Sequence, residues 1–303
     1  MTSVDTFCND LRLYLELMDA PSEERTTDVS KQEVQSVVDI YKLEVAKLGF
    51  LLCQDEEPDA ESFQKLLQTV QSSTFAICCI TSNLALKAGP VLRSSLLTIT
   101  KSIIDNTIAL AAATVGKEPS SLKSTIPRLA AMCFQSADTA AGMPLDNRAA
   151  IGRPLTRILK QIADAAHEMT QESQSFEGAA PPSFTAACRC MEAALRVLKA
   201  TARSLMTSDS CLTDEVEAWE RVLDRAKAVG SAVDDLGATS YDVCDHKDVD
   251  ELKAAVYCLV KAINLVVDEI PSTKSELVCN TASEAKEMMD SIVAELLTVN
   301  VLL

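Results

Sequence analysis

The chain has 303 residues, enough for two domains of ordinary size, and is 48% hydrophobic but only 4% aromatic. Its formal net charge of −16 argues against direct binding of nucleic acid, which needs clustered Lys and Arg. The same charge argues against electrostatic docking on anionic lipid, and no apolar stretch is long enough to span a bilayer.

Apolar residues recur at three- and four-residue spacing along almost the whole chain, which is the pattern of helices with one buried face. Alternating β-branched and aromatic residues, which would indicate strands, are missing. The sequence therefore predicts an all-α fold of about ten helices with short connections. The expected helices span residues 3–19, 29–53, 59–88, 91–115, 118–140, 144–175, 182–207, 212–236, 249–270 and 273–300.

Several of these helices carry local signals that interrupt or end them. Pro127 should kink the fifth helix or split off its first turn, and Gly152 with Pro154 should make the first two turns of the sixth irregular. The segment GATSYDVCDHKD, from Gly237 to Asp248, should interrupt or end the eighth helix.

A break of small residues and prolines, GAAPPS at 178–183, separates the sixth helix from everything downstream. We therefore expect two antiparallel helical bundles, an N-terminal one over residues 1–176 and an acidic C-terminal one over residues 177–303. Residues 1–28 can pack on either bundle. The charge is uneven: residues 209–303 carry a net −12 and residues 91–160 a net +5.

The eleven cysteines are scattered, and Cys78, Cys133, Cys188 and Cys258 fall on apolar helix faces. This pattern is typical of reduced, buried thiols rather than of a disulfide framework. The N-terminal stretch has no basic start or continuous apolar core, so it is not a signal peptide. We expect a protein of the cytoplasm and nucleus.

Catalytic, metal and cofactor sites find no support in the sequence. The group around His246, with Cys244, Asp245 and Asp248, lacks the spacing of a tetrahedral metal site and is better explained as a solvated turn. Asp234 and Asp235 could suggest a helical prenyl-transfer enzyme, but the further carboxylate one turn on is absent. We therefore expect no enzyme activity, no metal and no cofactor.

Two rows of basic residues are the candidate protein-binding residues. Each row falls within a narrow arc of one expected helix, at 100° per residue. The rows can form salt bridges with the acidic C-terminal helices or face solvent, or they can form a docking surface for an acidic partner helix. The first row is Arg153, Arg157 and Lys160, and the second is Arg189, Arg196, Lys199 and Arg203.

Residues 249–300 read as helix, short loop and helix, without a basic region before them. Two ordinary core helices of a bundle explain this layout best. If the pair did associate with the helix-loop-helix of a transcription factor, the complex could not grip DNA through this subunit.

Three stretches are informative in their order and spacing: GPVLRSSLLTITKSIIDNTIAL (89–110), LDNRAAIGRPLTRILKQIADAAHEMTQE (145–172) and VLDRAKAVGSAVDDLGATSYD (222–242). They resemble the corresponding stretches of the cyclin-D-binding protein family, also called GCIP. The resemblance covers roughly residue 30 to the end and includes no catalytic signature. It implies two all-helical bundles similar to those of vinculin, α-catenin and the talin rod. It also implies a regulator that binds D-type cyclins and helix-loop-helix transcription factors. A cytoskeletal or adhesion-type adaptor is the alternative.

Overall fold

The computed structural model contains ten helices and no strand within the residues that it describes, so the all-α prediction is confirmed. The helices divide the chain into two compact units, Met1–Asp146 and Asn147–Leu303. The described residues are 3–17, 29–54, 59–113, 119–176, 179–207, 215–246, 249–270 and 276–299.

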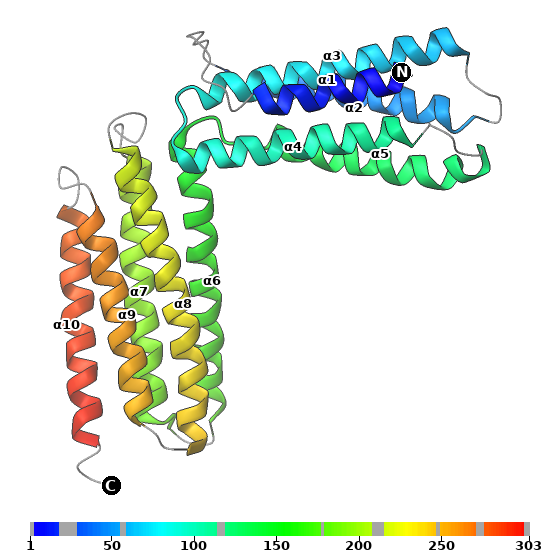
Figure 1. Ribbon diagram of the computed structural model, residues 1–303. Helices are drawn as coiled ribbons and strands as arrows, with labels where there is room; N and C mark the ends of the chain where they lie inside the picture. Colours follow the sequence, from blue (N-terminus) through cyan, green and yellow to red (C-terminus); the bar gives the residue numbers. More distant parts are fainter. Residues whose placement is uncertain are drawn as a thin grey trace. The chain divides into compact units, whose positions relative to one another are not determined.

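In the first unit, four helices form a closed ring in which each packs against two others, and α1 lies against α3 and α4 (Figure 1). The core of the ring is aliphatic, with one buried tyrosine, Tyr41, on α2. The helices are α1 (Ser3–Leu17), α2 (Lys31–Leu52), α3 (Ala60–Ala85), α4 (Pro90–Ala112) and α5 (Pro119–Ala141).

The placement of α1 settles which bundle the start of the chain joins. Phe7 and Leu11 are buried, and the Tyr14 ring packs against Phe75 of α3 at a centroid separation of 5.3 Å. Residues 3–17 therefore belong to the first unit, because α1 buries its apolar face against α3 and α4.

One hydrogen bond crosses the middle of the ring, between two helices that are not neighbours in it. The hydroxyls of Tyr41 on α2 and Thr107 on α4 lie 2.8 Å apart, and Thr107 donates to the backbone carbonyl of Ile103. Both side chains are buried, so the bond satisfies two hydroxyls that would otherwise be costly in an aliphatic core.

In the second unit, α7 to α10 form a ring of the same kind, and α6 lies against α7 and α8 (Figure 1). α7 contacts all four other helices and is the central element. Trp219 on α8, the only tryptophan of the chain, is fully buried in this unit. The helices are α6 (Asn147–Ser175), α7 (Pro182–Thr207), α8 (Val216–His246), α9 (Val249–Glu269) and α10 (Glu276–Val299).

The division between the units falls at 146/147 and not at 176/177, where the sequence placed it. Leu155, Ile158 and Ile162 of α6 are buried, and α6 packs on α7 and α8. Gly230 of α8 marks this contact, because a Cβ at that position would lie 3.5 Å from Ile158 Cγ2, an ordinary van der Waals distance. The GAAPPS break therefore falls within the second unit and does not separate the two, since the buried face of α6 has its partners downstream.

Three helices continue where the sequence indicated a break. α8 runs through Gly237 to His246, and a Cβ at 237 would lie 3.4 Å from Met191 Cε, so this glycine provides room for α7. Pro127 lies inside α5 and Pro154 inside α6. Pro154 is the eighth residue of α6, beyond the first four N–H groups that lack an intrahelical partner, so it removes one hydrogen bond from the helix without ending it.

The four cysteines that were expected to be buried differ in their exposure. Cys78 and Cys133 are buried as expected, whereas Cys188 is half-buried and Cys258 is exposed. On α9 the buried face runs through Leu252, Val256 and Leu259, and Cys258 lies outside that stripe. None of the cysteines in the described segments forms a disulfide.

The helix-loop-helix layout of residues 249–300 corresponds to α9 and α10, which are part of the ring. Val256, Leu259 and Ile263 of α9 are buried, as are Ala285 and Ile292 of α10. Their apolar faces pack on α7, on α8 and on each other. Both helices are therefore core elements of the second unit.

Candidate protein-binding surface

The first basic row lies on the outer face of α6. Arg153, Arg157 and Lys160 are all exposed, while Leu155 and Ile158 between them are buried. At 100° per residue the three cations point away from the buried face. The amphipathic pattern of α6 thus directs the whole row to solvent.

The second basic row lies on α7, and its four residues differ in their exposure and contacts. Arg196, Lys199 and Arg203 are exposed on the outer face of the helix. Arg189 instead donates from Nη1 to Glu295 Oε2 of α10 at 3.1 Å. Arg189 therefore forms one of the salt bridges to the acidic helices that the sequence left open as an alternative.

The two rows are brought level by the antiparallel pairing of α6 and α7. A Cβ at Gly152 would lie 3.8 Å from Leu205 Cδ2 and from Met206 Sδ, so the start of α6 lies beside the end of α7. Because both helices rise equally per residue, Lys160 comes level with the part of α7 between Arg196 and Lys199. We call the resulting surface the basic face. It consists of Arg153, Arg157, Lys160, Arg196, Lys199 and Arg203.

Acidic side chains are excluded from the stretches that carry the basic face. No Asp or Glu occurs in residues 147–163 or 193–207. The described part of the chain gives five of the cations no ion pair. These five are Arg157, Lys160, Arg196, Lys199 and Arg203.

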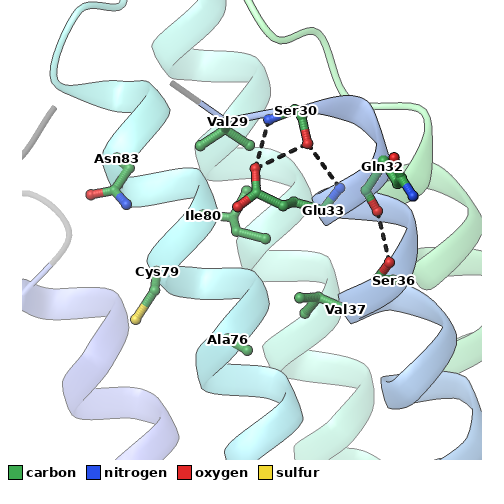
Figure 2. Close-up of a pocket in the computed structure, with 10 residues that line it drawn as sticks. All are labelled: Val29, Ser30, Gln32, Glu33, Ser36, Val37, Ala76, Cys79, Ile80 and Asn83. Carbon is green, nitrogen blue, oxygen red and sulfur yellow. Dashed lines mark hydrogen bonds between the residues drawn. The ribbon is translucent and has the colours of Figure 1, made fainter. Parts of the chain in front are cut away.

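A groove of about 580 Å³ lies between α2 and α3 in the first unit (Figure 2). Val37 and Ala76 contribute apolar walls, and Gln32 and Asn83 contribute polar ones. This groove was not predicted from the sequence, because it is the space between two helices rather than a property of either. Its lining residues are Val29, Ser30, Gln32, Glu33, Ser36, Val37, Ala76, Cys79, Ile80 and Asn83.

The carboxylate in this groove is committed to capping α2. The Ser30 backbone N–H donates to Glu33 Oε2 at 2.9 Å, and the Glu33 backbone N–H donates to Ser30 Oγ at 3.1 Å (Figure 2). The Ser30 backbone N–H, and after it the Ser30 hydroxyl at 3.0 Å, donate to the Glu33 carboxylate and hold its pKa below the usual value, since they favour the ionised form. Glu33 is thus a structural carboxylate and not a base matched to neutral pH.

Buried thiols are poor candidates for nucleophiles in this protein. Burial raises the pKa of Cys78 to about 12, of Cys133 to about 11 and of Cys190 to about 12. A nucleophilic cysteine needs a lowered pKa, because the thiolate is the reactive form. These side chains pack as small hydrophobes.

Metal-binding groups do not gather within the described residues. No three His, Cys, Asp or Glu side chains of that part of the chain are placed to share an ion. His167 is exposed on α6, with its Nε2 2.9 Å from the Gln171 side-chain nitrogen, and Asp234 and Asp235 are exposed on α8. The side chains of Cys244, Asp245, His246 and Asp248 lie outside the described residues.

The comparison with protein families concerns the helices from α2 to α6. Residues 33–175 match the family model described as Grap2 and cyclin-D-interacting, N-terminal. This stretch is therefore similar to the N-terminal domain of that family. The match begins in α2 and ends with α6, so it includes the first basic row. No curated protein matches the chain, and no described helix is long and apolar enough to cross a membrane.

Proposed function

We propose that this protein is a non-enzymatic regulator that binds D-type cyclins, helix-loop-helix transcription factors or both, and so restrains cell-cycle progression and transcription. The match of residues 33–175 to the cyclin-D-interacting family carries the proposal. Two kinds of potentially catalytic group fit the non-enzymatic part of the proposal. The Glu33 carboxylate caps a helix, and the buried thiols have raised pKa values.

The proposed mechanism is sequestration of a partner helix. A bundle can hold an amphipathic partner helix against its surface. A partner held in this way would be withheld from DNA, since a net charge of −16 argues against DNA binding by the chain itself. We further propose that the protein acts in the cytoplasm and the nucleus, where such partners are found.

Binding of the purified full-length chain to a purified D-type cyclin, measured by isothermal titration calorimetry, tests the proposal. We expect a saturable complex. An unrelated cyclin prepared in the same way serves as the matched control and should bind at least about tenfold more weakly, which corresponds to 1.4 kcal/mol.

The bundle architecture favours one competing function, that of a cytoskeletal adaptor. Co-sedimentation with F-actin separates the two functions in a single preparation. A chain that sediments with F-actin and gives no heat with the D-type cyclin would overturn the regulator proposal.

A further inference from the structure

We propose that the basic face of α6 and α7 binds an acidic segment of a partner protein, with Met206 providing an apolar contact beside it. The inference goes beyond the proposed function, because it concerns a surface and the chemistry of its ligand. It holds whether or not the partner is a cyclin.

Charge complementarity identifies the ligand as acidic. The basic face presents six cations from two helix stretches without a carboxylate, in a chain whose net charge is −16. Exposed cations usually have acids within reach on a strongly acidic protein, yet five of these six make no ion pair among the described residues. The local field is therefore positive and attracts carboxylates.

The size of the basic face favours a short peptide segment. Arg153 to Lys160 and Arg196 to Arg203 each cover two turns, about 10 Å at the rise of an α-helix. An acidic helix with carboxylates at positions i, i+3, i+4 and i+7 covers the same length.

Acids lie immediately beyond one end of the basic face on both helices. Asp164 follows Lys160 on α6, and Glu192 precedes Arg196 on α7, so the antiparallel pairing places both acids at the same end. Both are exposed. A nucleic-acid duplex or a membrane surface spreads its anions over much more than 10 Å, so anions that extend past this end would lie against these two carboxylates. The arrangement thus favours a ligand whose negative charge stops at this end of the basic face.

An apolar contact lies at the edge of the same surface. Met206 is 61% exposed on α7, and Gly152 of α6 leaves room beside its sulfur. A methionine adapts its shape to different apolar neighbours, so it suits a surface that receives a partner side chain. The expected ligand therefore carries an apolar residue next to its acidic row.

A synthetic helical peptide with four Glu at these spacings and one Leu beside them serves as the probe, and fluorescence anisotropy with the full-length chain measures its binding. Each exposed ion pair contributes up to a few-fold in affinity. Charge reversal of four cations together should therefore weaken binding of the peptide by about tenfold or more. The reversed positions are Arg157→Glu, Lys160→Glu, Lys199→Glu and Arg203→Glu.

A matched control changes the net charge by the same amount at exposed lysines on other helices. This control should bind the peptide within about twofold of the wild type after correction for net charge at 0.15 M salt, where the Debye length is about 8 Å. Circular dichroism should show both variants fully helical, because all eight positions are exposed. The control positions are Lys65→Glu, Lys101→Glu, Lys261→Glu and Lys286→Glu.

The proposal is overturned if the wild type does not bind the peptide, or if the two variants lose affinity equally. Duplex DNA and vesicles rich in phosphatidylserine are measured in the same way. The proposal is also overturned if either binds the wild type more tightly than the peptide does, and if this binding is lost in the basic-face variant but not in the control variant. The cyclin titration is a separate readout, so a failure here leaves the proposed function to its own test.

Discussion

The hydrogen bond between Tyr41 and Thr107 allows an asymmetric prediction about the core of the first unit. Thr107 donates to the Ile103 carbonyl, so the Tyr41 hydroxyl donates to Thr107. Tyr41→Phe removes the donor and leaves Thr107 with its backbone partner. We expect a loss of about 1 kcal/mol in the free energy of unfolding, the net value of one hydrogen bond.

Thr107→Val should cost more, although valine has nearly the shape of threonine. It leaves the fully buried Tyr41 hydroxyl without its acceptor, and an orphaned buried hydroxyl costs about 2 kcal/mol. The sulfur of Cys133 is the remaining neighbour and is only a weak acceptor. The double variant removes both polar groups, so it should lose about 1 kcal/mol less than the two single losses add up to.

Urea unfolding followed by far-ultraviolet circular dichroism gives the three free energies, and amide hydrogen exchange of α2 and α4 locates the loss. Both helices should exchange faster in Thr107→Val than in Tyr41→Phe. If Tyr41→Phe is the more costly change, or if the two losses add within about 0.3 kcal/mol, the reasoning about an orphaned hydroxyl is refuted.

Three further predictions concern a cap, a helix contact and the thiols. Ser30→Ala should destabilise the protein by about 1 kcal/mol through loss of the α2 cap, as measured in urea. Because the pKa of Glu33 is lowered, the contribution of its carboxylate is complete at neutral pH and is lost as pH falls through that lowered pKa. Ser30→Ala keeps the backbone N–H of residue 30 that donates to this carboxylate, so both proteins should lose that contribution in acid, while the difference due to the lost Oγ cap should remain. Gly230→Ala should stabilise by about 0.5–1 kcal/mol, since a Cβ fits against Ile158, whereas Gly230→Leu should destabilise by about 1–3 kcal/mol; the opposite order would mean that α6 and α8 do not pack as described. An aromatic disulfide reagent at pH 8 should label the exposed thiols first, and mass spectrometry should find the buried ones unlabelled until the protein unfolds. Burial raises the pKa of these thiols, so the folded state favours the neutral form. The resulting contribution to stability is complete below pH 9 and is lost as pH rises toward about 11, so unfolding at alkaline pH should coincide with labelling of the buried thiols. The exposed thiols are Cys79, Cys258 and Cys279, and the buried ones are Cys8, Cys78, Cys133 and Cys190.

Helices could be read from this sequence because their apolar period is local. The placement of α6 could not, since it depends on which helices receive Leu155 and Ile158, and these partners lie far downstream. The GAAPPS break combines every residue type that ends a helix, but such residues mark a turn and carry no information on which surfaces pack together.

The basic face was predicted only in part, again because local spacing does not tell which helices pack together. Each basic row follows from the angular spacing of one helix, as for Arg153 and Arg157. Their union with the α7 row needs the antiparallel pairing at Gly152, and the removal of Arg189 needs Glu295, which is 106 positions away in the chain. The α2–α3 groove depends entirely on tertiary packing, so no local pattern could have indicated it.

The span of the family match has a practical consequence for work with fragments. A fragment of residues 33–175 would lack α1, which covers α3 and α4, and would carry α6 without α7 and α8. Its α6 would expose an uninterrupted stripe of aliphatic side chains to water, and such a patch drives self-association. A fragment ending at Asp146 keeps the first five helices together, so binding partners captured with the longer fragment would include proteins that adhere to a surface the intact chain never presents. The stripe consists of Ile151, Leu155, Ile158, Ile162 and Met169.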